Sequence, residues 1–253
     1  MARIGKITWT VLQCLVLVLA AFLPGSHAAA ASDKLPDLGM AKLKHLNIVN
    51  RDGRRLLVFS TIIVNIGTGP FEVYGNRPDT TTTTMSATQR IYDDAGGYRD
   101  VLTPSVMRYS GDGHDHWHLQ ELETYELIRL NDRMKVATGT KIGYCFFDNV
   151  EFKLSLPGAP GKPFYTGCGN RRSTAIKTGL SVGWGDIYRY KLAGQDLDIT
   201  NLAPGNYRLQ VTSDSMHWFA ESNESNNVTW VDIQIKSKTG TNFSILSYGP
   251  FLK

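Results

Sequence analysis

Residues 56–64 read Leu-Leu-Val-Phe-Ser-Thr-Ile-Ile-Val, a run rich in β-branched and aromatic side chains. Such residues favour a pleated, well-packed strand over a helix. Residues 65–70 follow this run with Asn-Ile-Gly-Thr-Gly-Pro, which is the composition of a turn. Residues 71–74, Phe-Glu-Val-Tyr, then resume the apolar pattern. The sequence therefore predicts two strands joined by a turn in this region.

The same alternation of short apolar runs and turn residues continues along the chain. Further strands are predicted at residues 89–92, 122–130, 135–136, 207–212 and 228–235. The Thr-rich residues 76–86 are predicted to form a loop, and residues 93–98 a hairpin turn. No long stretch has clean helical spacing. The pattern predicts an all-β fold, an antiparallel β-sandwich with long loops and little helix.

The composition is that of an ordinary globular domain. Of the 253 residues, 42% are hydrophobic and 20% are charged, which provides enough apolar surface for a sizeable core. The formal net charge is +4, and it falls to +2 without Arg3 and Lys6, which lie in a segment expected to be removed. Because phosphate binding needs concentrated Lys and Arg, nucleic acid is not an expected partner.

Residues 1–31 have the organisation of a secretory signal peptide. Basic residues near the N-terminus precede a mostly apolar stretch at residues 11–23, and small residues follow at 28–32. The apolar stretch is short for a membrane span, although an uncleaved anchor is the alternative. Residues 32–253 contain no evident linker and are predicted to form one domain. We expect this domain to be secreted, extracellular or at the cell surface, with no stable membrane insertion after signal removal.

Two cysteines remain after removal of the signal, Cys145 and Cys168, which lie 23 residues apart. In an oxidising compartment such an isolated pair is expected to form a disulfide. A role as metal ligands is the alternative, but no Cys-x-x-Cys spacing supports it.

Three of the six histidines fall in the sequence Gly113-His114-Asp115-His116-Trp117-His118. On a strand, alternate side chains share a face, roughly 6.6 Å apart, so the three imidazoles would converge on one ion only where the strand curves. Nearby glycines make such curvature easy. The triplet predicts a metal site, and imidazole suits copper, zinc, nickel and iron alike. A polar surface strand is the alternative.

Several segments resemble the lysyl oxidase family, and they occur in the same order. These segments are residues 113–127, 139–145 (Gly-Thr-Lys-Ile-Gly-Tyr-Cys), 179–188 (Gly-Leu-Ser-Val-Gly-Trp-Gly-Asp-Ile-Tyr), 195–200, 204–207 and 221–228. Each segment is short, and their shared order over about residues 55–236 makes the resemblance specific. Animal members are rich in disulfides, whereas this chain has few cysteines.

The resemblance implies a cofactor, a reaction and residue roles. His114, His116 and His118 would bind copper, and Lys141 and Tyr188 would be cross-linked into lysine tyrosylquinone. The implied enzyme uses molecular oxygen to deaminate primary amines oxidatively, and it releases aldehyde, ammonia and hydrogen peroxide. Peptidyl lysine on a secreted or surface protein and small amines are both expected substrates.

Asp186 is a candidate base for removing a proton from the substrate carbon next to the amine. It precedes Tyr188 by two residues, so on a strand the two side chains would share a face. An aspartate in a loop or turn is the alternative interpretation.

Two other functions agree with parts of the sequence. Residues 35–38 and 204–227 resemble bacterial cell-adhesion-related domains, so a non-catalytic β-sandwich scaffold with a metal site is one alternative. A zinc hydrolase that uses three histidines and a bound water is the other. The hydrolase needs a general base, for which Glu121 and Glu123 are the nearest glutamates in the sequence.

Overall fold

The computed structural model describes Met1 and residues 31–110, 115–140 and 143–253. The chain divides into two units, Met1–Ala30 and Ala31–Lys253. The predicted signal peptide falls almost wholly on the first unit, where residues 2–30 lie outside the described residues. Among the residues that are described, no helix is long and apolar enough to cross a membrane.

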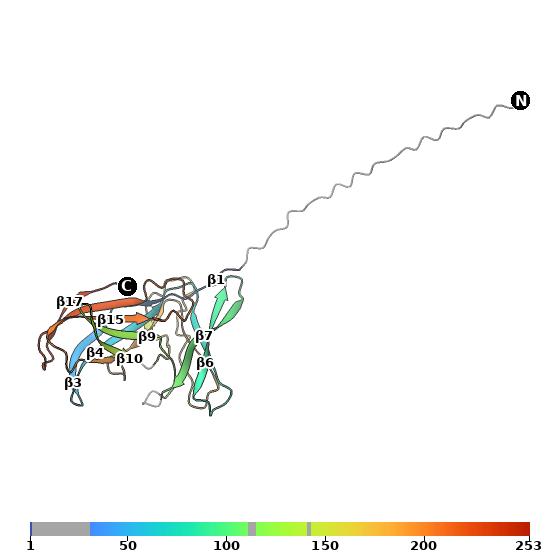
Figure 1. The fold of residues 1–253 in the computed structure, drawn as a ribbon. Helices are drawn as coiled ribbons and strands as arrows, with labels where there is room; N and C mark the ends of the chain where they lie inside the picture. The colour runs from blue at the N-terminus through green and yellow to red at the C-terminus, as the bar shows by residue number, and fades with distance from the viewer. Residues whose placement is uncertain (2–30, 111–114, 141–142) are drawn as a thin grey trace. The chain divides into compact units, whose positions relative to one another are not determined.

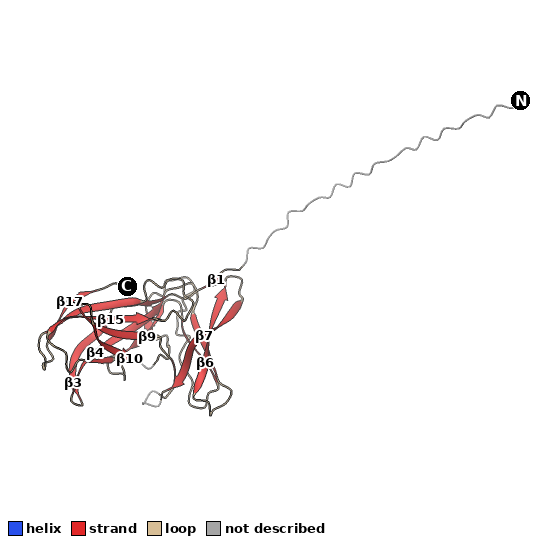
Figure 2. Cartoon of the chain, in the orientation of Figure 1, coloured by secondary structure: helices blue, strands red, loops and turns tan. Residues whose placement is uncertain are grey.

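The second unit is built from strands that form three sheets, and its described residues contain no helix (Figure 1, Figure 2). The first sheet contains, in order, β12 (Ala175–Leu180), β5 (Phe71–Asn76), β6 (Thr84–Asp93), β7 (Tyr98–Tyr109) and β8 (Trp117–Leu119), with β1 (Asp33–Lys34) beside β6. The second contains β10 (Lys135–Thr140), β9 (Glu123–Arg129), β15 (Gly205–Ser213), β16 (Val228–Ile235) and β17 (Phe243–Tyr248). The third contains β11 (Val150–Glu151), β13 (Trp184–Tyr188), β4 (Arg54–Asn65) and β14 (Asp196–Asp198), with β2 (Leu38–Met40) and β3 (Lys44–Arg51) beside β4. These strands pair antiparallel, which confirms the predicted all-β class.

The apolar run at residues 56–64 lies within β4, which pairs with β2, β3, β13 and β14. Its side chains alternate between two hydrophobic clusters. Phe59 and Ile63 belong to the large core, whereas Ile62 and Val64 belong to a smaller cluster. A strand that is covered on both faces does not need to alternate apolar and polar residues, which explains the continuous apolar run.

Most other predicted strands are present with shifted ends, and residues 228–235 coincide with β16. The predicted hairpin turn joins β6 to β7. Two features differ from prediction. The loop predicted for residues 76–86 is shorter because β6 begins at Thr84, and the long strand β7 has no counterpart in the prediction. Much of β7 is exposed and polar, and the strand contains Pro104, so it lacks the apolar pattern on which the prediction depends.

The large hydrophobic core includes side chains from all three sheets. Phe59 of β4 meets Tyr125 of β9 edge to face, with ring centroids 4.9 Å apart. Phe71 of β5 meets Phe146 in the same way, with ring centroids 5.2 Å apart. The sheets therefore share a core, and residues 144–149, which precede β11, run beside it towards the site described below.

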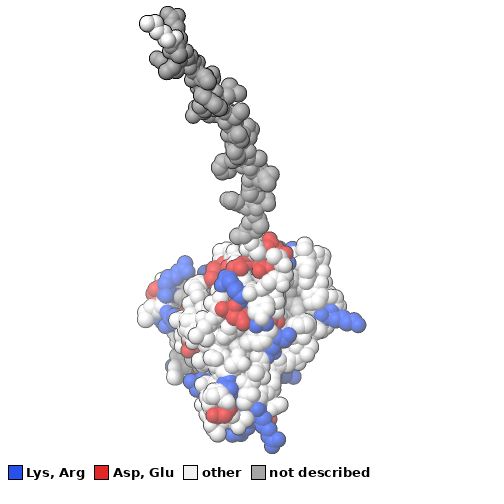
Figure 3. All heavy atoms as spheres, turned by 90° about the vertical axis from the view of Figure 1, so that its right-hand side faces the viewer, with Lys and Arg blue, Asp and Glu red and all other residues white. Residues whose placement is uncertain are grey.

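Charges of both signs occur together on the face that carries β1, β6 and β7 (Figure 3). Several of them pair locally. Arg99 lies 2.6 Å from Asp33, and Arg90 lies 2.8 Å from Asp100. Such exposed pairs contribute about 0–1 kcal/mol each, so this surface adds little to the stability of the fold.

Candidate functional site

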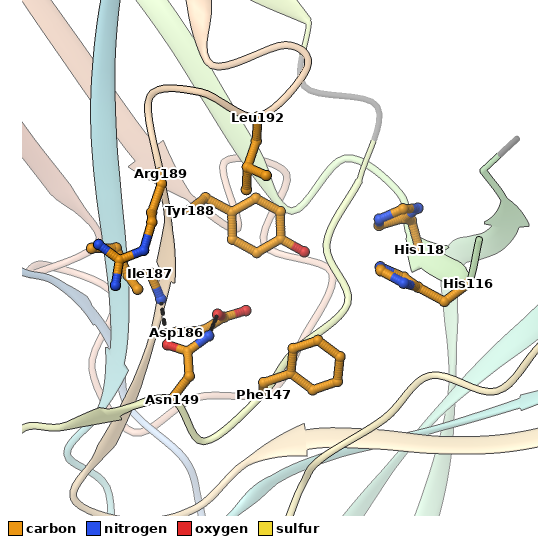
Figure 4. Close-up of a pocket in the computed structure, with 9 residues that line it drawn as sticks. All are labelled: His116, His118, Phe147, Asn149, Asp186, Ile187, Tyr188, Arg189 and Leu192. Carbon is orange, nitrogen blue, oxygen red and sulfur yellow. Dashed lines mark hydrogen bonds between the residues drawn. The ribbon is translucent and has the colours of Figure 1, made fainter. Parts of the chain in front are cut away.

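A cavity of about 350 Å³ lies at the end of β13. The residues that line it are His116, His118, Phe147, Asn149, Asp186, Ile187, Tyr188, Arg189 and Leu192 (Figure 4). Four of the predicted site residues therefore meet in one place: two histidines, the tyrosine and the aspartate. In Figure 4 the imidazoles lie at one side of the cavity, and the hydroxyl of Tyr188 points towards them.

The histidine pair sits where the first sheet ends in β8. His118 is buried within β8 and lies opposite Arg108 of β7, whereas His116 lies in the bend just before the strand. Of these two histidines, only His118 therefore lies on a strand. The two imidazole centroids are nevertheless only 4.6 Å apart. His114, the third predicted ligand, lies outside the described residues.

Tyr188 is buried at the end of β13, where its hydroxyl is held by the backbone of Cys145. The hydroxyl accepts a hydrogen bond of 2.7 Å from the Cys145 N–H and donates one of 3.2 Å to the Cys145 carbonyl oxygen. Burial raises the pKa of Tyr188 well above its usual value, and the negative charge of Asp186 raises it further. The phenol is therefore held neutral and in a defined position.

The predicted disulfide between Cys145 and Cys168 is present, with a Cα–Cα distance of 5.8 Å. Its two ends lie beside different parts of the site. The backbone of Cys145 holds the Tyr188 hydroxyl. The carbonyl oxygen of Cys168 accepts a 3.1 Å hydrogen bond from the backbone N–H of Trp117, which lies between the two histidines in the sequence. The disulfide thus links the backbone around the tyrosine to the backbone around the histidines.

Asp186 shares a face of β13 with Tyr188, and both side chains line the cavity. Its side chain is only 1% exposed. The side-chain N–H of Asn149 donates a 2.5 Å hydrogen bond to Asp186 Oδ1. The side-chain oxygen of Asn149 accepts a 2.9 Å hydrogen bond from the backbone N–H of Ile187. Because Asn149 is itself fixed by the backbone of β13, it fixes the orientation of the carboxylate (Figure 4).

A second buried carboxylate lies beneath the tyrosine. Glu123, the first residue of β9, accepts hydrogen bonds from the hydroxyl groups of Thr61, Tyr125 and Tyr144. The ring centroid of Tyr144 lies 4.0 Å from that of Tyr188. Glu123 therefore belongs to a buried network under the site, and it is not among the residues that line the cavity.

Glu121, the other glutamate considered for a hydrolase, is exposed and has a positive φ of 59°. It does not line the described part of the cavity either. Neither candidate base of the zinc hydrolase is therefore among the described residues that line the cavity with the histidines. Lys141, the predicted partner of Tyr188, lies outside the described residues.

Asn149, Phe147 and Leu192 are among the cavity residues that were not predicted from the sequence. Phe147 and Asn149 precede β11, and Leu192 lies in the turn after β13, where its N–H donates to the Arg189 carbonyl oxygen. These residues belong to no periodic run, so the sequence carries no signal for their role. They form the apolar wall and the carboxylate support of the site.

Comparison with known proteins identifies the relatives of this chain. The profile of the family described as Lysyl oxidase matches residues 98–244. The protein-lysine 6-oxidase of Homo sapiens is 34% identical over 147 residues, which cover 54% of this chain and 31% of that protein. Lysyl oxidase homolog 2 of Gallus gallus is 36% identical over 118 residues, or 46% of this chain and 14% of that protein. Lysyl oxidase homolog 3A of Danio rerio is 30% identical over 180 residues, which cover 69% of this chain and 18% of that protein.

The matched region thus spans about a third or less of the length of these three relatives. The family profile itself covers more than half of this chain, and the match includes β8, β13 and the segment between them. The chain therefore belongs to the lysyl oxidase family.

Proposed function

We propose that the chain is a secreted, copper-dependent amine oxidase that oxidises primary amines through a quinone derived from Lys141 and Tyr188. The observation that carries the proposal is the presence of His116, His118, Asp186 and Tyr188 around one cavity. The names of the relatives add support, since protein-lysine 6-oxidase states both an oxidation and a lysine substrate.

The donor set fits a copper ion. Imidazole nitrogen is a ligand that copper accepts readily, and centroids 4.6 Å apart are compatible with two imidazoles bound to one ion. The proposed ligands are His114, His116 and His118. When bound, copper and the quinone would supply the electrophilic carbonyl and the redox capacity for the reaction of an amine with molecular oxygen and water, which gives an aldehyde, ammonia and hydrogen peroxide.

The residues of the chain would bind the amine and move its proton. Phe147 and Leu192 offer apolar surface for the methylene groups of an alkylamine such as a lysyl side chain. Asp186, oriented by Asn149, is the proposed base that takes a proton from the carbon next to the amine nitrogen. The backbone of Cys145 holds the hydroxyl of Tyr188, and with it the ring position.

A peptide map of copper-loaded, aerated protein, before and after phenylhydrazine treatment, tests the proposal. We expect one peptide that joins Lys141 to Tyr188, with the hydrazine attached to it. Unmodified Lys141 and Tyr188 in fully copper-loaded protein would contradict the oxidase function and leave the histidines as a binding or zinc site. Detection of residues 32–253 in the medium without residues 1–31 would test the proposed secretion.

Leu192→Ala removes part of the apolar wall of the cavity. We expect it to raise KM for hexylamine about fivefold, equivalent to about 1 kcal/mol, with kcat nearly unchanged and with little effect on methylamine. Leu246→Ala is the control because Leu246 is exposed on β17 and does not line the cavity. Equal effects of Leu192→Ala on both amines would argue against an alkyl-binding wall at this position.

A further inference from the structure

The two histidines flank a tryptophan that faces the other way. Alternate residues of a strand point to opposite sides, so the Trp117 ring leaves β8 on the side away from His118. The two sides are occupied differently, because the histidines line the first cavity whereas Trp117 lines a second one of about 460 Å³. The indole Nε1–H donates a 2.9 Å hydrogen bond to the Asn170 carbonyl oxygen. Trp117 is thereby attached to the loop before β12.

Arg77 covers the face of this tryptophan ring. Its guanidinium carbon lies 4.6 Å from the ring centroid, and the side chain is only 9% exposed. Its nitrogens donate to backbone carbonyl oxygens of Thr80, Thr82, Arg171 and Ser173, at 2.6–3.2 Å. A planar guanidinium with this many fixed partners cannot turn without breaking several bonds, so it is a rigid support for the ring.

We propose that Arg77 and Trp117 are positioning residues that hold the rings of His116 and His118 in a metal-binding arrangement, an inference that rests on the proposed metal role of these histidines. Rotation of β8 together with the bend before it would move both imidazoles and separate them from a shared ion. The indole bond to Asn170 and the contact with Arg77 oppose that rotation from behind the strand. Groups that orient metal ligands in this way commonly change metal affinity by about 10–100-fold when they are removed.

Arg55 provides a matched control for Arg77. Arg55 is also buried, at 4% exposure, and its guanidinium also donates to backbone carbonyl oxygens, those of Ile199, Ser237, Lys238 and Gly240. It lies in β4 near the turn to β3, and neither of the two cavities near β8 includes it. Arg55→Met and Arg77→Met therefore remove equivalent backbone support, but only the second removes a contact with Trp117.

The experiment measures copper(II) affinity of the metal-free full chain by competition with a chelator, together with the midpoint of urea unfolding. We expect Arg77→Met to weaken copper binding about 10–100-fold and Arg55→Met to leave it unchanged, while both variants lose stability. Arg77→Lys keeps a cation above the ring, and it is expected to retain more of the affinity than Arg77→Met does.

Equal affinities of the Arg77→Met and Arg55→Met variants would overturn the positioning role and leave the proposed function intact. Absence of copper binding by the unsubstituted chain would instead contradict the proposed function. Should Arg77→Met fail to fold, Trp117→Phe provides a second test, since it keeps an aromatic ring beneath the guanidinium and removes the N–H donor together with part of the indole. An unchanged copper affinity of Trp117→Phe would then overturn the proposal, and a weakened affinity in a folded variant would support it.

Discussion

Replacement of Asp186 by asparagine is expected to lower kcat for a primary amine by about 10²–10⁴-fold, because a positioned general base typically contributes that much to a proton transfer. Asparagine keeps the size of the side chain and can still contact Asn149, but it cannot accept a proton from carbon. The proposed cross-link between Lys141 and Tyr188 is expected to form in this variant. Steady-state kinetics combined with the phenylhydrazine adduct separates these two effects.

Asp148→Asn is the control for this prediction. Asp148 is also a buried aspartate, but it accepts hydrogen bonds from the backbone of Phe164, Tyr165 and Ser181 and does not line the cavity. We expect its loss to lower stability while kcat of the folded enzyme changes little. An Asp186→Asn enzyme that forms the adduct and turns over at the normal rate would remove Asp186 from the mechanism.

Removal of the disulfide by Cys145→Ala with Cys168→Ala is expected to lower the free energy of unfolding by about 3 kcal/mol, the loop-entropy value for cysteines 23 residues apart. Cross-linking of Tyr188 should also slow, because Cys145 holds its hydroxyl and Cys168 holds the backbone of Trp117. Urea unfolding with and without a reductant measures the first effect, and a timed peptide map measures the second.

The unsubstituted chain serves as the internal reference for this experiment, since reductant should bring its unfolding midpoint close to that of the double variant. An unchanged midpoint would show that the disulfide adds no stability. Cross-linking at the normal rate, at a temperature where the double variant is folded, would show that the disulfide does not position the tyrosine.

The site residues that the sequence reveals are those on short regular segments. His116 and His118 are two residues apart beside β8, and Asp186 and Tyr188 are two residues apart in β13, so each pair follows the period of a strand. Asn149 carries no comparable signal. It reaches Asp186 only because the segment before β11 lies against β13, a neighbourhood created by tertiary packing.

The same difference in sequence signal explains which strands could be predicted. β4 and β16 bury most of their residues, and their apolar side chains identify them in the sequence. β7 is largely exposed over its first half, so no periodic apolar run marks it. Its position follows from backbone hydrogen bonds to β6. Polar and apolar residues form such bonds alike, so they leave no pattern in the sequence.

The central position of β4 also has a consequence for how fast the chain acquires its structure. Two of the partners of β4, β13 and β14, come from residues 184–198, more than a hundred positions along the chain. Pairing of β4 with β13 and β14 must therefore wait for the closure of a very long loop, and topologies dominated by such distant pairings fold slowly. A slowly folding chain stays unfolded for longer after synthesis, and this delay would favour the proposed secretion, because an unfolded chain can pass through an export channel.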